Sequence, residues 1–453
     1  MSSKKDLVEA HSFNRRRLIT AFVSGAPGGR EVEPVRYGRT LVGGLVLALL
    51  IVAGAAVAPL LKTALPKDWN QNGLVVGKES GSRFVAYQGT LYPVINTTSA
   101  RLILGAEGKF DVNFVPDDKI AEQKQGPTIG IAGAPDLLPS TGNLVQTGWS
   151  ACTNDAQAVR VALAAKTPVT VSARGAFVAE APDGSTQVVA GGERFPVPGG
   201  ERGISTLRAL GLDGEAARPV PGLWLDLVPR GSPLTPFRVD GAGARVETGV
   251  AGLDQVGSPL RVDGRPYVLS RDGLLPLSDF AYTIYRSSGT GASIPEKEVA
   301  SGELTKVGTV NDATRLPYPG DWPESDVTAF GTPETPCLLL STTASAAGTV
   351  ALASPDAPEA EATDGVTRSV ESGHGALVQS TSGGVIGSGT TFVVDATGTR
   401  YAVGQKGAVD APLTALGYRS TKPRPVPDSW MDLFGDGPAL TAQAATQAAG
   451  GQQ

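Results

Sequence analysis

Hydrophobic positions along the chain follow two patterns. One long apolar stretch, Thr40–Leu61, contains no charged residue. Beyond it, apolar residues occur in short runs between glycine- and proline-containing turns, as in Arg83–Tyr87 and Thr391–Val394. Short β-branched and aromatic runs bounded by turn residues are typical of β-strands. The pattern therefore predicts an α+β, β-rich fold that follows a single apolar helix.

The apolar stretch is long enough to serve as a membrane anchor. At about 1.5 Å rise per residue, some twenty residues span roughly 30 Å of hydrocarbon. A cleaved signal peptide is the alternative, and Ala56-Val57-Ala58 offers a cleavage motif. Signal peptides, however, have a short basic leader and an apolar run of about 7–15 residues. Because both segments are longer here, we expect an uncleaved, single-pass helix.

The charge distribution indicates which side of the membrane each segment occupies. Residues 1–39 carry eight basic and four acidic residues, a net charge of +4, whereas the whole chain has a net charge of −5. Positively charged flanks stay in the cytoplasm. The N-terminus, with a basic helix expected over Lys4–Val23, is therefore cytosolic, and residues 62–453 are outside. Their net charge of −9 argues against a nucleic-acid partner, because such a partner attracts basic surfaces.

The two cysteines, Cys152 and Cys337, both follow the apolar stretch and so fall in an oxidising compartment. Two cysteines allow one intramolecular disulfide. Two buried free thiols are the alternative.

The outer region contains internal repeats. The segment Ala209–Leu234 aligns without gaps to Ala415–Leu440 at an offset of 206 residues. The aligned positions include Trp224 with Trp430 and Leu227 with Leu433. Looser copies are Gly81–Gly105 and Pro259–Leu277; the latter contains a hairpin, Arg261–Leu269, with Asp263-Gly264 at its tip. The pattern of each copy predicts a hairpin, then a short helix, then a proline-rich extended segment. Units of this size pack against one another to bury a core.

The repeated tryptophan and leucine residues have two interpretations. Trp224, Leu227, Trp430 and Leu433 are either core residues or an exposed binding platform, and their regular recurrence favours the core. Asp226 and Asp432 also recur, which favours capping or turn roles over catalysis.

Signatures of catalysis are missing from the sequence. The segment Gly73–Glu79 has three residues between its glycines, whereas a phosphate loop needs four, and Glu79 stands where Ser or Thr would hold magnesium. A nucleophile elbow is also missing, and His11 and His374 are the only histidines. Two cysteines and one outer histidine do not form the usual closed zinc site. We therefore expect no cofactor or metal and favour a non-enzymatic role.

Several short segments, in order along the chain, resemble one known family, the EccB proteins of the type VII (ESX) secretion system. They include Leu74–Lys78, Leu91–Asn96, Ser99–Ile103, Gly130–Asp136, Trp149 with Cys152, Arg208–Leu212 and Pro336-Cys337. The resemblance implies a cytosolic helix, one transmembrane helix and a periplasmic region of similar modules around a central disulfide-bearing β domain. It also implies an inner-membrane complex with further copies of the chain, with EccC-, EccD- and EccE-like subunits and with a mycosin-like protease. Some members are labelled ATPases, but this sequence has no Walker motif. The stretch Ser341–Gly384 departs from the family pattern.

Together these observations predict a domain order and a function. The expected order is a cytosolic basic helix (1–39), a transmembrane helix (40–61), module 1 (62–138), a first segment of the central domain (139–175), module 2 (176–243), module 3 (244–330), a second segment of the central domain with a flexible loop (331–390), module 4 (391–440) and a disordered tail (441–453). The expected function is that of a structural subunit of a secretion complex in the inner membrane. A membrane-anchored protein that binds or hydrolyses the cell wall is the alternative.

Overall fold

The structure is a computed structural model of the full chain. It describes residues 4–24, 37–57, 65–105, 111–154, 158–287, 289–304, 306–310, 312–331, 335–346, 348–357, 365–382, 385–387, 389–405 and 408–449. The chain forms two compact units, Met1–Lys67 and Asp68–Gln453.

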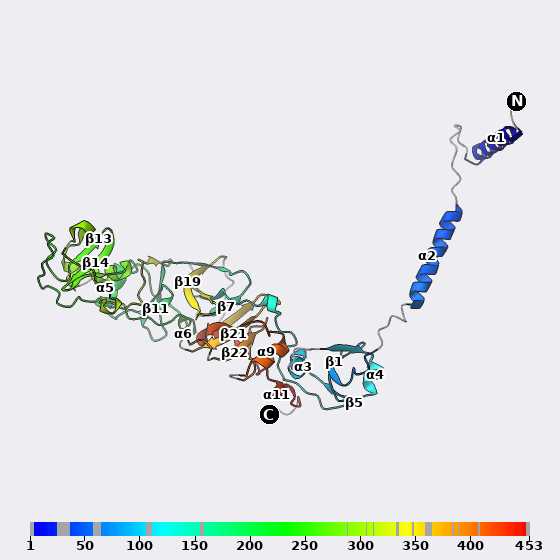
Figure 1. The fold of residues 1–453 in the computed structure, drawn as a ribbon. Helices are drawn as coiled ribbons and strands as arrows, with labels where there is room; N and C mark the ends of the chain where they lie inside the picture. The colour runs from blue at the N-terminus through cyan, green and yellow to red at the C-terminus, as the bar shows by residue number, and fades with distance from the viewer. Residues whose placement is uncertain are drawn as a thin grey trace. The chain divides into compact units, whose positions relative to one another are not determined.

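The first unit consists of two helices, α1 (Lys4–Ser24) and α2 (Tyr37–Val57) (Figure 1). The helix expected over Lys4–Val23 is thus confirmed. Apolar side chains of both helices are exposed, among them Phe22 at 94% and Leu41 at 72%. Within the described residues, no helix is both long and apolar enough to cross a membrane. The end of the expected anchor, residues 58–61, lies outside the described residues.

The second unit contains four sheets built in the same order. In module 1, β1 (Asn72–Gly77), β2 (Arg83–Tyr87) and β3 (Thr90–Pro93) form an antiparallel meander, followed by α3 (Thr97–Leu104). Next, β4 (Val112–Val115) pairs in parallel with the first strand. After α4 (Asp117–Ala121), β5 (Lys124–Gln125) pairs in parallel with the third strand.

Modules 2 and 4 repeat this arrangement. Module 2 comprises β9 (Gly175–Glu180), β10 (Thr186–Ala190), β11 (Glu193–Pro196), α5 (Glu201–Ala209), β12 (Arg218–Pro219) and α6 (Gly222–Leu225). Module 4 comprises β21 (Ala376–Thr381), β22 (Thr391–Val394), β23 (Thr399–Ala402), α9 (Asp410–Leu416), β24 (Arg424–Pro427), α10 (Asp428–Met431) and β25 (Gly435–Asp436). In both modules the strand after the longer helix pairs in parallel with the first strand.

Module 3 comprises β13 (Pro259–Val262), β14 (Arg265–Ser270), β15 (Gly273–Pro276), α7 (Asp279–Arg286), α8 (Gly289–Ser293) and β16 (Lys297–Val299). Its first two strands form the predicted hairpin, with Asp263 and Gly264 at the tip. Their φ angles are 48° and 80°. Two positive φ angles are what a two-residue type I′ turn requires, and Asp-Gly adopts them at low cost.

The central sheet is assembled from two distant segments of the sequence. Its order is β20-β7-β6-β18-β19-β8. The strands β6 (Trp149–Thr153), β7 (Val159–Leu163) and β8 (Val169–Val171) precede modules 2 and 3 in the sequence. The strands β18 (Cys337–Ser341), β19 (Thr349–Pro355) and β20 (Val366–Val370) follow them. Modules 2 and 3 are therefore an insertion in the central domain.

Three regions of the second unit differ from the sequence predictions. The strand β17 (Thr328–Ala329), expected in module 3, instead pairs with β9 in the sheet of module 2. Thr342–Gly373, within the expected flexible loop, contributes β19 and β20, which pair with β18, β8 and β7. The strand β21, expected in the central domain, instead starts the sheet of module 4. Both strands of the supposed loop owe their structure to distant partners, which local composition does not reveal.

The C-terminal tail also differs from the prediction of disorder. It contains α11 (Ala442–Ala445), whose N-cap Thr441 accepts a hydrogen bond from Ala444 N. Ala445 is fully buried and shares a core with Leu102 of α3. Ala448 then forms an antiparallel bridge with Ile129. The tail thus packs on residues of module 1; the last four residues, 450–453, are outside the described ranges.

Candidate functional site

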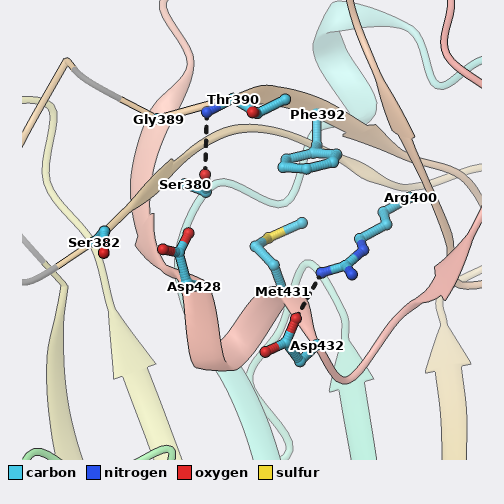
Figure 2. Close-up of a pocket in the computed structure, with 9 residues that line it drawn as sticks. All are labelled: Ser380, Ser382, Gly389, Thr390, Phe392, Arg400, Asp428, Met431 and Asp432. Atoms are coloured by element: carbon cyan, nitrogen blue, oxygen red, sulfur yellow. Dashed lines mark hydrogen bonds and ion pairs between the residues drawn. The ribbon is translucent and has the colours of Figure 1, made fainter.

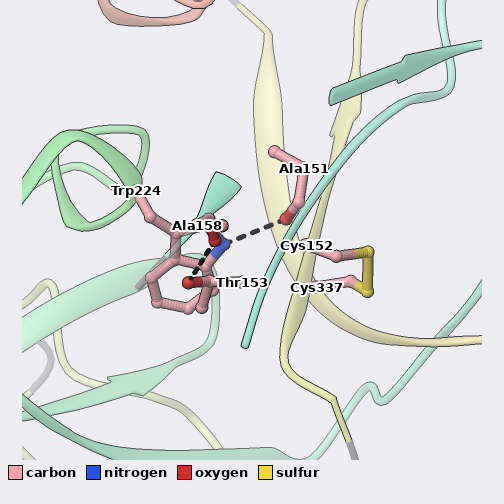
Figure 3. The surroundings of a disulfide bond; sticks show 6 residues. All are labelled: Ala151, Cys152, Thr153, Ala158, Trp224 and Cys337. Carbon is pink, nitrogen blue, oxygen red and sulfur yellow. Dashed lines mark hydrogen bonds between the residues drawn. A yellow bond between two sulfur atoms is a disulfide. The ribbon is translucent and has the colours of Figure 1, made fainter. Parts of the chain in front are cut away.

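The predicted disulfide lies at the centre of the composite sheet. Cys152 on β6 and Cys337 on β18 face each other in an antiparallel pair, with Cα atoms 3.9 Å apart. The neighbouring pair is hydrogen-bonded, since Thr153 N donates to Pro336 O, so the cysteines occupy a non-hydrogen-bonded position, where side chains are closest. Both are at most 2% exposed and joined by a disulfide (Figure 3), so the free-thiol alternative is wrong.

The repeated tryptophans are buried, and one of them is bonded to the strand that carries Cys152. Trp224 and Trp430 are fully buried, and Leu227 and Leu433 are at most 1% exposed. The indole of Trp224 donates to Ala151 O at 3.0 Å, next to Cys152 (Figure 3). The indole of Trp430 donates to Leu227 O at 3.2 Å. One indole therefore binds module 2 to the central sheet, and the other binds module 4 to module 2.

These contacts belong to one continuous core. This core is formed by residues from three parts of the chain: the central sheet (Trp149, Leu338), module 2 (Phe177, Trp224) and module 4 (Trp430). Aromatic pairs within it are edge-to-face: the Phe177 and Trp224 centroids are 5.9 Å apart at 81°. Such a pair contributes about 0.5–1.5 kcal/mol beyond burial. The predicted repeat residues are thus brought together with residues of the central sheet in a junction, which we define as this shared core; Cys152 and Cys337 belong to a separate cluster.

The repeated aspartates flank the junction as partners of arginines. Arg194 Nη2 lies 2.9 Å from Asp226, and Arg400 Nη1 lies 3.1 Å from Asp432. The guanidinium of Arg400 also binds Asp436 at 2.7 Å and holds the pKa of that carboxyl below its usual value. The arginine side chains are only 18% and 16% exposed, whereas the aspartates are exposed by more than half.

These arginines were not predicted from the sequence, although the repeat contains a signal for them. The offset of 206 residues that aligns Trp224 with Trp430 also carries Arg194 onto Arg400, upstream of the aligned block. The aspartates close α6 and α10 as C-cap residues, which agrees with a turn role. The arginines add a cross-link between the third strand and the end of this short helix.

The aligned glycines Gly231 and Gly437 have a packing reason. A Cβ on Gly231 would lie 2.5 Å from the ring of Phe195, and one on Gly437 would lie 2.3 Å from the ring of Tyr401. Neither distance is compatible with a side chain. Glycine therefore lets the segment after the short helix lie against the aromatic residue of the third strand in both modules.

The loop that resembles a phosphate loop is already occupied by carboxylates. Asp117 accepts a hydrogen bond from Ser80 N at 2.9 Å, and Glu79 accepts one from Asp117 N at 2.9 Å. A phosphate would have to compete with Asp117 for the loop amide and would meet two negative charges. Across the described ranges, no three His, Cys, Asp or Glu side chains gather as a metal site would require.

Comparison with known proteins identifies the family. The family model described as type VII secretion system ESX-1, transport TM domain B, matches residues 1–452. The chain therefore belongs to the EccB family.

Relatives and solved structures agree with this assignment. The ESX-2 secretion system ATPase EccB2 of Mycobacterium tuberculosis is 29% identical over 313 residues, which cover 65% of this chain and 61% of the relative. The ESX-3 secretion system ATPase EccB3 of the same species is 26% identical over 457 residues, covering 90% and 83%. The EccB3 dimer from the ESX-3 core complex has a similar fold, with a TM-score of 0.66 at 24% identity over 83% of this chain and all of that one. A chain of the intact ESX-5 inner membrane complex gives 0.62 at 22% identity over 99% and 95%.

Proposed function

We propose that this protein is a non-enzymatic structural subunit of a type VII (ESX) secretion complex in the inner membrane. The observation that carries the proposal is the junction. The recurring residues of the chain are used to join modules 2 and 4 to the central sheet, in a core that excludes water. An assembly of this kind presents a fixed outer surface to partners and keeps its recurring residues inside.

In this proposal the chain is a single-pass membrane protein anchored by residues 40–61. The uncharged stretch and the positive N-terminal flank support this topology, with residues 62–453 in the periplasm. Exposed apolar side chains along α2 such as Leu45 and Leu49 would then contact lipid or neighbouring helices. A buried disulfide suits an oxidising compartment.

The proposed partners are EccC-, EccD- and EccE-like subunits, a mycosin-like protease and further copies of the chain. They are supported by family membership and by solved relatives from an ESX-5 inner membrane complex and an ESX-3 core complex. Tethering in one membrane raises the local concentration of these partners, so modest contacts between their outer domains suffice.

The test is co-purification from detergent-solubilised membranes. The tagged full chain should migrate on native gels as a large complex that contains the EccC-, EccD- and EccE-like subunits. A chain that migrates alone, with none of these subunits, would contradict the proposal.

Two other functions have less support. A cell-wall-binding protein would use exposed aromatic residues, but Trp224 and Trp430 are fully buried. An ATPase, the activity in the names of the EccB2 and EccB3 relatives, would need a phosphate site, but Asp117 occupies the loop that comes nearest to one. Binding of the purified chain to peptidoglycan, or phosphate release that persists without any EccC-like ATPase, would favour one of these functions instead.

A further inference from the structure

Module 4 contains a pocket of about 410 Å³ that has no part in the junction or in the proposed function (Figure 2). It lies between the ends of β21 and β22 and the short helix α10. Figure 2 shows its lining: hydroxyl residues on one side, the guanidinium of Arg400 on the other, the ring of Phe392 above the thioether of Met431, and carboxylates on α10 and after it. The lining residues are Ser380, Ser382, Gly389, Thr390, Phe392, Arg400, Asp428, Met431 and Asp432.

The corresponding position in module 2 is closed. Arg218 pairs with Ala179 as Arg424 pairs with Val378, which makes Ala181 the counterpart of Ser380. In module 2, three residues separate Ala181 from Ser185, whose carbonyl accepts the Ala181 N–H. In module 4, nine residues separate Ser380 from Thr390, which are joined by the same hydrogen bond.

The short turn of module 2 covers the start of its helix. Pro182 Cγ lies 3.5 Å from where a Cβ on Gly222 would stand. At the aligned position module 4 has Asp428, whose carboxylate extends from α10 toward Ser380 and Ser382 (Figure 2). One copy of the repeat therefore has a proline against a glycine where the other has an aspartate in an open pocket.

The pocket carries an excess of negative charge. Arg400 is already bound by two carboxylates, Asp432 at 3.1 Å and Asp436 at 2.7 Å. Among the described residues, the carboxylate of Asp428 has no hydrogen-bond or ion-pair partner. The charged groups that line the pocket, Arg400, Asp428 and Asp432, sum to a charge of −1. Asp436, which also binds Arg400, adds a further negative charge outside the lining, so a cation is the ligand that the pocket would attract.

The remaining lining favours a cation on an aliphatic stem. Met431 is 1% exposed and Phe392 is half-buried, and both form the apolar side of the pocket. Ser380 is 7% exposed; its oxygen accepts from Thr390 N, and the described residues offer no acceptor for its own hydroxyl hydrogen. Side-chain oxygens at scattered angles suit the three rotatable donors of an ammonium better than a planar guanidinium, which prefers a single carboxylate.

We infer that this pocket binds the lysine side chain of a polypeptide partner. The ammonium group lies between Asp428 and the serine hydroxyls, and the methylene stem lies along Phe392 and Met431. A polypeptide is favoured over a wall-derived amine because the same loop exposes Val385 at 58% and Ile386 at 43%, which offer apolar contacts to residues beside the lysine. The inference concerns the chain alone and does not depend on the secretion role.

The experiment uses the only two methionines, Met1 and Met431, as probes. The full chain is labelled with ¹³C-methyl methionine and titrated with a short peptide of the pattern Leu-Lys-Leu. The Met431 signal should shift saturably at millimolar peptide, while the Met1 signal should stay in place. The same peptide with norleucine for lysine should bind more weakly, and Asp428→Asn should weaken binding of the lysine peptide about five-fold.

The matched control is Asp226→Asn, which removes a carboxylate from module 2 and should leave the titration unchanged. An unchanged Met431 signal in free Asp428→Asn shows that the pocket is still folded. Three results would overturn the inference: no shift of Met431, equal shifts with the norleucine peptide, or equal affinity in Asp428→Asn. A shift with 1,5-diaminopentane or a muropeptide but not with the lysine peptide would also overturn it, in favour of a wall-derived amine.

Discussion

Trp430 should be the residue on which the contact between modules 2 and 4 most depends. It is fully buried, and its indole is bonded to Leu227 O in the other module. Replacing a buried tryptophan with alanine typically costs about 3–5 kcal/mol, because apolar burial is lost and a cavity remains. Trp430→Phe keeps most of the burial but leaves the Leu227 carbonyl without this donor, which costs about 1–3 kcal/mol.

Hydrogen exchange measured by mass spectrometry separates local from shared effects. Because about 1.4 kcal/mol corresponds to a factor of ten, Trp430→Ala should speed exchange at least a hundred-fold in peptides that cover 424–434 and also in those that cover 218–228. Trp430→Phe should speed exchange in the same peptides by about five- to a hundred-fold.

Trp224→Phe provides the comparison. Its indole bonds Ala151 O, and Ala151 is paired with Leu338 at a hydrogen-bonded position of the sheet, so this carbonyl retains a partner after the substitution. Trp224→Phe should therefore perturb exchange less than Trp430→Phe. If Trp430→Ala affects only 424–434 and leaves 218–228 protected as before, the two modules do not depend on each other and the reasoning is refuted.

Three further predictions address other regions of the chain. Replacing Cys152 and Cys337 with serine should lower the free energy of unfolding by up to about 5 kcal/mol, because the disulfide closes a loop of 185 residues and restricts the unfolded chain. Urea unfolding with and without reductant measures this loss, and an unchanged unfolding midpoint would contradict the prediction. Deleting residues 442–453 should speed exchange in α3, because α11 and the bridge to Ile129 are lost, and unchanged protection of α3 would show that the tail is dispensable. Arg400→Met should raise the pKa of Asp436 toward its ordinary value, which NMR can follow, and an unmoved pKa would contradict the pairing. In the natural chain, the lowered pKa of Asp436 adds a small stability. This stability is present at pH values above the pKa of the carboxyl in the unfolded chain and is lost as the pH falls through its pKa in the folded chain.

Local features of the fold were predictable from the sequence. The hairpin at Asp263-Gly264 follows from a dipeptide that tolerates positive φ, and the disulfide follows from two cysteines in an oxidising compartment. The burial of Trp224 and Trp430 agrees with the preference for core positions, because residues that recur with a structural repeat tend to serve that structure.

Features that depend on distant pairing were not predictable. The strands β19 and β20 lie in a stretch of small residues and form because β8 and β7 provide partners about two hundred residues earlier. After Leu440 the tail has no large apolar residue and is rich in glutamine and glycine, which indicates disorder when considered alone, yet a small side chain is what allows Ala445 to be buried near α3. The pocket of module 4 depends on a loop length and on one aspartate, and only the comparison of two folded modules makes the difference visible.

The insertion of modules 2 and 3 into the central domain has a consequence for how the chain folds. The strand β8 has its partner in β19, which is synthesised only after both inserted modules. Because the chain is synthesised from its N-terminus, modules 2 and 3 can complete their own sheets while the first half of the central sheet still has unpaired edges. Closure of the central sheet, and with it the Cys152–Cys337 bond, is then a late and slow step of high contact order. A chain interrupted before residue 337 would have folded modules but an exposed sheet edge, the kind of species that aggregates or is degraded.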